Sequence, residues 1–299
     1  SYMSALYTER FSDYQQKIEE ALNACLPQPG RPWDTVARGM HYACEGGGKR
    51  LRPVLLLEFC RLCGGEPEKA LPFACAVEMI HSYSLVHDDM PCMDNSPMRR
   101  GKPSVHTAFG EDMALLTGDG LLTYAFETML DPAACRLPAS CALAAAHTLA
   151  VKAGITGMVG GQTVDLETEG RRITPDELWE LQEGKTAAML EAVCRMGVQL
   201  AGGTTAQEQA AERFGQQLGH GFQIVDDILD ATADAETLGK PVGEDAEAQK
   251  NTYVTLLGLE KAQKLAADCT AAALSALDCF GDAADELRRL TAALLIRDH

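Results

Sequence analysis

Two groups of aspartates stand at the ends of apolar segments of the sequence. The first lies in SLVHDDMPCMD, residues 84–94, and the second lies in FQIVDDILD, residues 222–230. A buried carboxylate is costly without a partner, and carboxylates that face one another repel unless cations lie between them. Hard oxygen ligands suit Mg²⁺, which usually keeps several waters and is completed by substrate phosphates. The two groups therefore predict Mg²⁺ ions that hold a diphosphate.

The two groups need different backbone geometry. In the second, spacing of i, i+3, i+4 and i+7 places four polar residues on one helical face: Gln223, Asp226, Asp227 and Asp230. A solvated stripe is the alternative, but the residues between them are apolar. In the first, Asp88 and Asp94 would lie about 240° apart around an unbroken helix. We expect Pro91 to break that helix and return Asp94 to the side of Asp88.

Basic residues that could bind a diphosphate directly lie in two motifs. GGGKRLRP, residues 46–53, places Lys49, Arg50 and Arg52 beside glycines whose backbone N–H groups can approach an anion. MRRGKP, residues 98–103, follows the first aspartates, and single basic residues come later: Lys185, Lys240 and Lys250. Each alone is more often a solvated charge. Together they predict two diphosphate sites, one bound through metal and one held by Lys and Arg alone.

The segments that position these residues are predicted to be helices. Apolar residues at helical spacing, among many Ala, Leu, Gln and Glu, are found in SDYQQKIEEALNACL, DELWELQEGKTAAMLEAVCRMGVQL and EQAAERFGQQLGHGFQIVDDILD. The breaks are short: LPQPGRPW, GGEPEKALP, LDPAACRLP, TEGRRITPDE and TLGKPVGED. The valine-rich alternation of strands is absent. We expect one all-α domain over residues 1–299, a bundle of about ten helices around a central cavity, with residues 1–2 an addition before Met3.

Composition limits the partners and the location. Lys plus Arg number 26 against 43 Asp plus Glu, a net charge of −17, which argues against nucleic acid as a general partner. Eleven cysteines without a regular framework indicate reduced thiols and a cytoplasmic protein, and Cys60 and Cys63 form a CxxC that we expect to serve packing. The most apolar stretch, residues 141–161, contains His147 and Lys152, so we expect no membrane span and no export.

Two other metal sites fit the aspartates less well. A structural Ca²⁺ site would need a twelve-residue loop of ligands. A di-iron carboxylate bundle would need Glu-x-x-His pairs on facing helices. The sequence contains neither pattern.

Five motifs resemble those of the trans-isoprenyl diphosphate synthases, most closely the bacterial farnesyl diphosphate synthases: EMIHSYSLVHDDMPCMDNSPMRRGKPSVH, GGGKRLRP, MVGGQTVDL, GKT and GFQIVDDILD. They span nearly the whole chain in the family's order. The resemblance implies an all-α isoprenoid synthase fold and a homodimer. It implies a Mg²⁺-dependent transferase, with about three ions around the bound diphosphate. The enzyme would join isopentenyl diphosphate to dimethylallyl and then geranyl diphosphate.

The resemblance also implies roles for individual residues. Metal would be bound from one side by Asp88 and Asp94, with Asp89 in support, and from the other by Asp226, with Asp227 and Asp230 beside it. The allylic diphosphate would also contact Arg99, Lys185, Lys240 and Lys250. Isopentenyl diphosphate would be held by Gly48, Lys49, Arg52, His81 and Arg100. Thr186 and Gln223 would face the reacting carbons.

Neighbouring positions of the first motif bear on product length. Tyr83 and Ser84 lie about one helical turn deeper than Asp88. In the family an aromatic residue at the fifth position before the motif limits the pocket, which implies that Tyr83 stops growth at fifteen carbons. The alternative is that Tyr83 is a core aromatic. Geranylgeranyl diphosphate remains the alternative product, because that branch can share the longer DDxxxxD spacing.

Other residues near the motifs have weaker signals. His81 lies seven residues before Asp88 on the same helical face, which favours substrate contact, whereas His87 is expected to be structural. Gly160 and Gly161 are expected to allow close helix approach. Two polar residues that follow could line the cavity or form hydrogen bonds within it: Gln162 and Asp165.

Two other functions compete with this interpretation. A class I terpene cyclase would share the first acidic motif, but it should lack GGGKRLRP and usually carries an Asn/Ser/Glu metal motif in place of the second. A non-catalytic subunit of a heteromeric synthase would be expected to have lost aspartates, and all six are present. Both are therefore less favoured than an active synthase.

Overall fold

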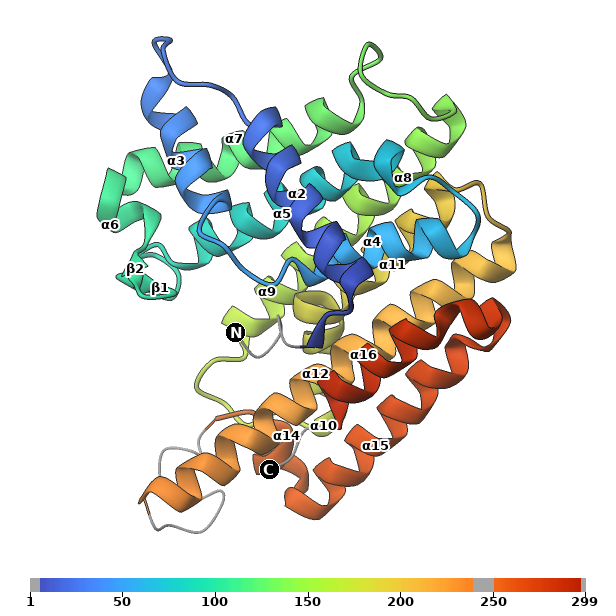
Figure 1. Ribbon diagram of the computed structural model, residues 1–299. Coiled ribbons are helices and arrows are strands. Elements are labelled where there is room, and N and C mark those ends of the chain that lie inside the picture. Colours follow the sequence, from blue (N-terminus) through green and yellow to red (C-terminus); the bar gives the residue numbers. More distant parts are fainter. Residues whose placement is uncertain (1–5, 239–249, 297–299) are drawn as a thin grey trace.

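The computed structural model describes residues 6–238 and 250–296, which form a bundle of helices (Figure 1). The helices of the first half are α2 (Glu9–Cys25), α3 (Asp34–Cys44), α4 (Leu51–Leu62), α5 (Pro67–Asp88), α6 (Val105–Phe109), α7 (Glu111–Met129) and α8 (Ala139–Ala153). Those of the second half are α9 (Met158–Glu167), α10 (Pro175–Gln182), α11 (Ala188–Leu200), α12 (Thr205–Leu238), α14 (Tyr253–Leu257), α15 (Leu259–Ala276) and α16 (Asp285–Leu295). A π-helical turn, η1 (Glu183–Ala187), and a 3₁₀ segment, η2 (Asp278–Ala284), complete the set. The predicted all-α class is confirmed, and one domain over residues 1–299 stays a prediction.

The local sequence explains where these helices begin. Thr8 caps α2 by accepting a hydrogen bond from Phe11 N, and Thr174 and Glu177 form a reciprocal capping box at α10, with Pro175 at the first helical position. The break predicted at GGEPEKALP is shorter than expected, because α5 begins at Pro67 and contains Pro72. Pro72 removes one backbone donor near the start of a helix that is otherwise buried along most of its length.

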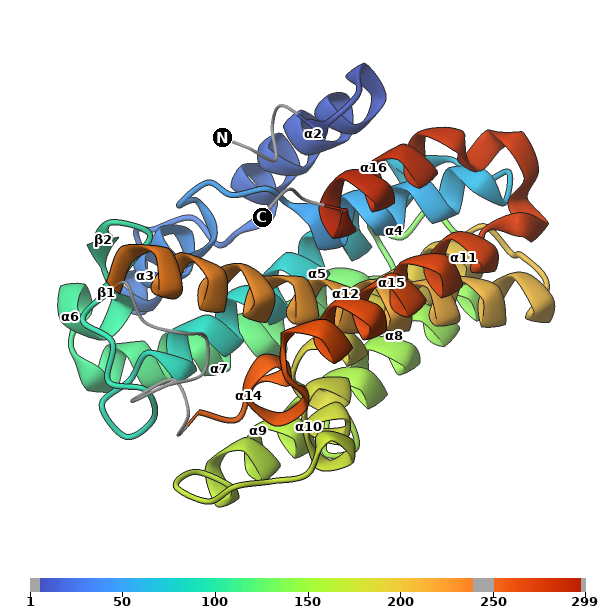
Figure 2. The ribbon, with the colours of Figure 1, turned by 90° about the horizontal axis from the view of Figure 1, so that it is seen from below.

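The core lies around α5 and α11, which are buried on most sides. α5 packs against α4 and α7, and α11 packs against α4, α8 and α12. A second, smaller apolar cluster joins α10, α12, α14 and α15. Figure 2 shows α12 running across the bundle with α15 beside it. The two helices that carry the aspartates, α5 and α12, are thus both fixed by packing along their length.

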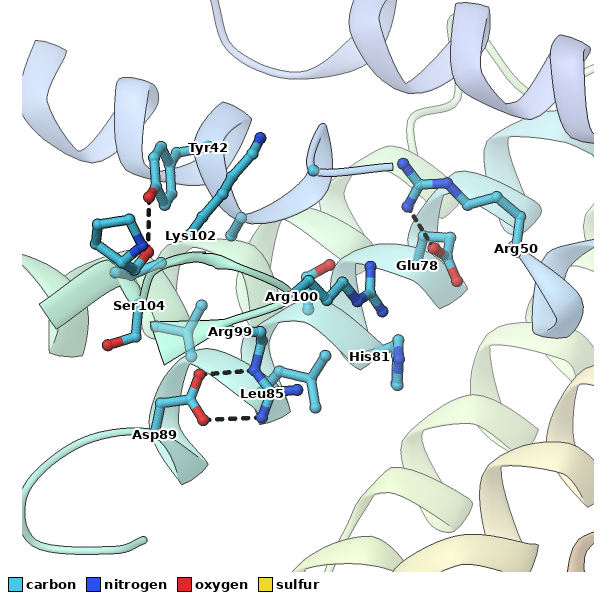
Figure 3. Close-up of a pocket in the computed structure, with 16 residues that line it drawn as sticks. Tyr42, Arg50, Glu78, His81, Leu85, Asp89, Arg99, Arg100, Lys102 and Ser104 are labelled. Atoms are coloured by element: carbon cyan, nitrogen blue, oxygen red, sulfur yellow. Dashed lines mark hydrogen bonds and ion pairs between the residues drawn. The ribbon is translucent and has the colours of Figure 1, made fainter. Parts of the chain in front are cut away.

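A β-hairpin of two short strands lies in MRRGKP, where no strand was predicted. β1 (Met98–Arg99) pairs antiparallel with β2 (Lys102–Pro103). Arg100 and Gly101 form the two-residue turn with φ of 52° and 77°. Two-residue hairpin turns of this kind need positive φ at both positions, which the glycine adopts without strain. The hairpin folds back over the end of α5 and places Arg99 and Arg100 in the wall of a small pocket there (Figure 3).

The segment DELWELQEGKTAAMLEAVCRMGVQL was predicted as one helix, which is wrong in detail. It is divided into α10, the π-helical turn η1 and α11. Gly184 in η1 packs against Gly161 of α9, and a Cβ on Gly161 would collide with the backbone of Gly184 and Lys185. This close approach is a tertiary contact, so helical periodicity alone could not reveal the turn.

One segment, Ala139–Glu167, is apolar and long enough to cross a membrane, with a hydropathy of 1.3. Residues 154–157 divide it into α8 and α9, and α8 packs against α11 inside the bundle. These two observations favour bundle helices over a span.

Candidate active site

Two adjoining hollows form the cavity between α5 and α12. One, of about 400 Å³, is lined by α5, α9 and η1, and the other, of about 790 Å³, by the start of α4, α5 and α12. They share three lining residues, Arg52, His81 and Thr186. Asp88 lines the first hollow and Asp226 the second. The predicted cavity between the two aspartate groups is therefore present.

The first aspartate group folds as the sequence predicted. α5 ends at Asp88, and the chain turns back through Pro91 so that Asp94 N donates to Asp88 O at 2.8 Å. Burial and the nearby charge of Asp94 raise the pKa of Asp88 to about 6. Gln162 of α9 donates to Asp88 Oδ1 at 3.3 Å. The turn thus gathers negative charge at the mouth of the first hollow.

Asp89 has a different environment from its neighbours. It is 2% exposed, and Arg99 donates to both of its carboxylate oxygens, from Nε at 2.7 Å and from Nη2 at 2.8 Å (Figure 3). This bidentate pair satisfies a buried carboxylate. Asp89 and Arg99, predicted to support metal and to contact diphosphate, are here bonded to each other.

The second aspartate group divides along α12. Asp226 and Gln223 line the second hollow. Asp227 accepts from Tyr253 N and from Gln223 Nε2, each at 3.0 Å, and burial raises its pKa to about 6. Asp230 is exposed one turn further on. Asp226 is thus the member that lines the cavity, with Asp227 anchored behind it.

Basic residues at the start of α4 point in different directions. Arg50 also lines the second hollow, but its guanidinium is buried and bonds Glu78 (Figure 3), Glu19 and Cys44 O, so these donors are occupied within the protein. Arg52 lines both hollows, and its buried Nε has no hydrogen-bond partner in the part of the chain that the structure describes. Burial lowers the pKa of Arg52, an effect that Glu78 offsets in part. A buried guanidinium donor left open toward a cavity suits an anion.

The glycine run lies against the hairpin. Arg100 donates to Gly47 O at 2.6 Å, and a Cβ on Gly48 would lie 2.8 Å from Arg100 Nη1. Gly48 has φ of 143°, a conformation that favours glycine. Lys49 is exposed at the rim of the second hollow, with its carbonyl bonded to Tyr7 Oη. The motif therefore brings Gly48, Lys49 and Arg100 to one edge of the cavity.

His81 lies between the two hollows and also lines the enclosed pocket behind the hairpin (Figure 3). Burial and the positive charges of Arg52, Arg100, Arg99 and Arg50 keep its pKa well below the ordinary value. The ring is therefore neutral in this environment. A diphosphate nearby would offset the surrounding positive charge.

Lys185 and Thr186 lie on the π-helical turn. Lys185 Nζ contacts Asp165 Oδ2 at 2.7 Å, and Thr186 Oγ1 donates to Gln182 Oε1 at 2.8 Å. Both residues line the first hollow. Gln162 and Asp165, whose role the sequence left open, therefore bond to Asp88 and Lys185 at this site.

Tyr83 and Ser84 line the deeper part of the first hollow. The Tyr83 ring stands edge-on to His87, with ring centroids 5.5 Å apart, and His87 Nε2 lies 3.0 Å from Leu115 O. Ser84 Oγ donates to His81 O at 2.7 Å. His87 thus makes the structural contacts predicted for it, and Tyr83 faces the cavity with its ring held in place.

The donor set fits Mg²⁺ bound together with a phosphate ligand. Within residues 6–238 and 250–296, no three His, Cys, Asp or Glu side chains converge closely enough to hold a metal alone. Mg²⁺ sites commonly use one or two carboxylates and are completed by waters and phosphate oxygens. Asp88 and Asp226 supply such carboxylates from the two hollows, and Asp94 lies exposed on the turn beside Asp88.

Lys250, Cys60 and Cys63 line neither hollow. Lys240 lies outside the described residues. Lys250 is exposed, and its carbonyl accepts from Thr255 Oγ1 at 2.6 Å. Cys60 is buried and Cys63 half-buried; burial raises the pKa of the first thiol to about 12 and of the second to about 11.

Comparison with known proteins agrees with this geometry. Residues 34–283 match the polyprenyl synthetase family. The chain is 44% identical to a farnesyl diphosphate synthase of Geobacillus stearothermophilus, over 99% of this chain and 100% of the relative. It is 42% identical to a chloroplastic geranylgeranyl pyrophosphate synthase of Capsicum annuum, over 91% of this chain and 72% of the relative.

Solved structures give the same picture. An FPP/GFPP synthase from Zymomonas mobilis superimposes with a TM-score of 0.83 at 36% identity, covering 94% of this chain and 95% of that one. A geranyltransferase from Legionella pneumophila superimposes with a TM-score of 0.85 at 33% identity, covering 95% of this chain and 94% of that one.

Proposed function

Since the chain belongs to the polyprenyl synthetase family and is a prenyltransferase of the trans-isoprenyl diphosphate synthase type, we propose that it makes farnesyl diphosphate. It condenses isopentenyl diphosphate head-to-tail with dimethylallyl diphosphate and then with geranyl diphosphate. The observation that carries the fifteen-carbon product is Tyr83, an aromatic ring that lines the hollow about one turn below Asp88.

The allylic diphosphate binds on the aspartate side. Asp88 and Asp94 hold Mg²⁺ from α5 and its turn, and Asp226 holds it from α12, with about three ions around the bound diphosphate. Asp227 is anchored behind Asp226, Asp230 is exposed one turn further along α12, and Asp89 bonds Arg99 near Asp88. Further positive charge comes from Lys185 on the π-helical turn and from the later basic residues, Lys240 and Lys250.

Isopentenyl diphosphate binds on the cationic side. Its diphosphate lies among Lys49, Arg52, His81 and Arg100, with Gly48 able to contribute a backbone contact. The buried Nε of Arg52 supports this placement, because it has no hydrogen-bond partner among the described residues. A diphosphate oxygen would accept its hydrogen bond and remove the cost of burying an unpaired donor.

The reaction follows from the two charged sides. Bound Mg²⁺ supplies the positive charge that stabilises the departing diphosphate. The allylic C–O bond breaks, and the diphosphate leaves with the bonding electrons. The positive charge of Lys185 also stabilises this leaving diphosphate. The double bond of isopentenyl diphosphate then attacks the allylic carbon, and loss of a proton to the released diphosphate restores a double bond. Thr186 and Gln223 turn polar oxygens toward the reacting carbons, and the apolar cavity excludes water.

We propose that the chain forms a homodimer and works in the cytoplasm. Exposed apolar side chains on α7, α8 and the turn after α8 support the homodimer: Leu115, Leu116, Leu143, Val151 and Ile155. An apolar surface of this kind is typical of a subunit interface.

One experiment tests the proposed function. Purified protein is incubated with Mg²⁺, isopentenyl diphosphate and dimethylallyl diphosphate, and the chain length of the products is measured. We expect fifteen-carbon product. Twenty-carbon product would assign the chain to geranylgeranyl diphosphate synthesis, as in the Capsicum relative, and no product would favour a non-catalytic subunit.

A further inference from the structure

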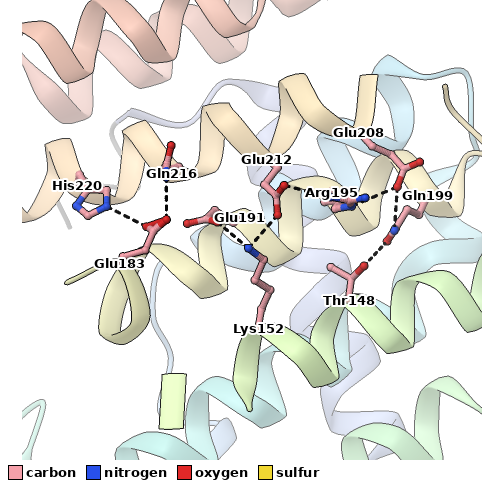
Figure 4. Close-up of polar contacts among 10 residues, drawn as sticks. All are labelled: Thr148, Lys152, Glu183, Glu191, Arg195, Gln199, Glu208, Glu212, Gln216 and His220. Carbon is pink, nitrogen blue, oxygen red and sulfur yellow. Dashed lines mark hydrogen bonds and ion pairs between the residues drawn. The ribbon is translucent and has the colours of Figure 1, made fainter. Parts of the chain in front are cut away.

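A polar cluster connects the two walls of the cavity on the side away from the substrates. Glu183 is the first residue of the π-helical turn η1, two residues before Lys185. Its carboxylate accepts from Gln216 Nε2 at 2.8 Å and lies 2.9 Å from His220 Nε2 (Figure 4). Gln216 and His220 lie one turn apart on α12, so a single side chain ties the π-helical turn to that helix.

Two contacts in the described part of the chain hold the His220 ring, a stacking contact and the contact with Glu183. Its side chain is fully buried, and its ring stacks on Trp179 of α10 at a centroid distance of 3.5 Å and an interplanar angle of 4°. Nδ1 has no hydrogen-bond partner among the described residues, so the polar contact of the ring is the one with Glu183. Burial alone would raise the pKa of Glu183, but hydrogen bonds with His220, Gln216 and Glu191 outweigh it and hold the pKa at about 2. Glu183 is therefore a strong, ionised acceptor.

The two ends of this contact lead to opposite walls of the cavity. Lys185 and Thr186 follow Glu183 in η1 and line the first hollow. Gln223 and Asp226 follow His220 on α12 and line the second. The Glu183–His220 contact therefore joins the turn that carries Lys185 to the helix that carries Asp226, beside the packing of Gly219 on Ala187.

The position of the extra residue in the π-helical turn determines which side chains face the cavity. The turn contains one more residue than an α-helical turn, and moving that residue along the chain would rotate neighbouring side chains by about 100°. Lys185 and Thr186 would then leave the cavity. An anchor at the first residue of the turn opposes that movement.

We infer that Glu183 and His220 are positioning residues, which hold the π-helical turn in register on α12 so that Lys185 and Thr186 face the allylic substrate. The inference rests on the proposed function. Neither residue lines the two hollows, so each acts through the residues that follow it.

The test compares kinetic constants for the two substrates. In Glu183→Ala we expect KM for the allylic diphosphate to rise about tenfold and kcat to fall by a similar factor, as for a misplaced contact at a reacting centre. KM for isopentenyl diphosphate should stay within about twofold, because Arg52 and its neighbours lie on other elements. Glu183→Gln keeps an acceptor for His220 and should recover most of the activity. His220→Gln keeps a donor and serves as the milder variant if Glu183→Ala does not fold.

Glu212→Ala is the matched control. Glu212 lies on the same helix, two turns before His220, and contacts Lys152 Nζ at 2.9 Å and Arg195 Nη1 at 3.1 Å (Figure 4). Its loss also breaks partly buried polar contacts, so we expect a lower melting temperature without a selective change in allylic KM. Equal losses for both substrates in the Glu183 and His220 variants, or the same selective loss in Glu212→Ala, would overturn the inference. An inactive wild type would instead refute the proposed function.

Discussion

The cavity contains two groups of side chains with opposite charge, called here the metal side and the cationic side. The metal side consists of Asp88 in the first hollow, Asp226 in the second, and Asp94, which is exposed on the turn beside Asp88. The cationic side consists of Arg52 and Arg100 around a neutral His81. Burial and Asp94 raise the pKa of Asp88, while burial and the arginines lower the pKa of His81. One side therefore needs added cations before it can accept a diphosphate, and the other can accept one directly.

This difference predicts the largest effect for a metal-side carboxylate. Asp226→Ala should lower the turnover rate about a hundredfold, which corresponds to about 3 kcal/mol in the activation barrier. The reason is that the variant loses a carboxylate proposed to bind the Mg²⁺ that stabilises the departing diphosphate. Isopentenyl diphosphate binding should change little. Steady-state rates at saturating Mg²⁺ measure this, with Asp268→Ala, an exposed aspartate on α15, as the control. Near-normal turnover in Asp226→Ala would show that the second aspartate group does not act through metal.

A reciprocal pair of variants separates the two sides. Arg52→Ala should weaken isopentenyl diphosphate about tenfold to a hundredfold through loss of a charge-assisted contact of about 1.5 to 3 kcal/mol. Lys185→Ala should weaken the allylic diphosphate instead. Titration calorimetry with unreactive analogues of each substrate measures both affinities. If each variant lost affinity equally for the two substrates, the assignment of the sides would be wrong.

Acid should weaken the metal side more than the cationic side. The pKa of Asp88 is raised to about 6, so below that pH a proton occupies the carboxylate that Mg²⁺ must bind. The apparent Mg²⁺ affinity should then fall by up to about tenfold per pH unit as the pH drops below 6. Mg²⁺ titrations with an unreactive allylic analogue at pH 5 and pH 7 measure this fall.

The substrate diphosphates also gain protons in this range, so binding of an isopentenyl analogue without metal supplies the baseline. Asp88→Asn removes the titrating carboxylate and should flatten the difference between the two sides. A fall of the same steepness in Asp88→Asn would assign the pH dependence to another group.

Periodicity predicted the parts of this site that depend on one helix. The face with Gln223 and Asp226 follows from spacing along α12, and the return of Asp94 beside Asp88 follows from the break at Pro91. Both are local consequences of residue order. The metal and substrate roles of these residues stay predictions.

Contacts between distant segments could not be predicted in the same way. Arg50 and Arg52 look alike in the sequence, and both line the second hollow. The guanidinium of Arg50 bonds Glu19 and Glu78, whereas Arg52 Nε has no partner among the described residues. The bond between Asp89 and Arg99 depends on a hairpin that only the glycine in its turn signals. The π-helical turn depends on α9 packing against η1, far apart in the sequence.

We expect the smallest effect on rate from replacing Tyr83. This replacement tests whether the metal side alone sets the length of the product. Tyr83 lies below Asp88 on the metal side, so its replacement should change how long an allylic chain fits without changing isopentenyl diphosphate binding. Tyr83→Ala removes a ring that His87 holds edge-on and opens space for about one more isoprene unit, at a packing cost of about 3 kcal/mol or less because the ring is only half-buried. We expect fifteen-carbon product from the wild type and a shift toward twenty carbons in the variant. Chromatography of the dephosphorylated products measures the ratio, and Tyr83→Phe, which keeps the ring, should retain the wild-type profile. An unchanged profile in Tyr83→Ala would mean that another residue forms the floor of the hollow.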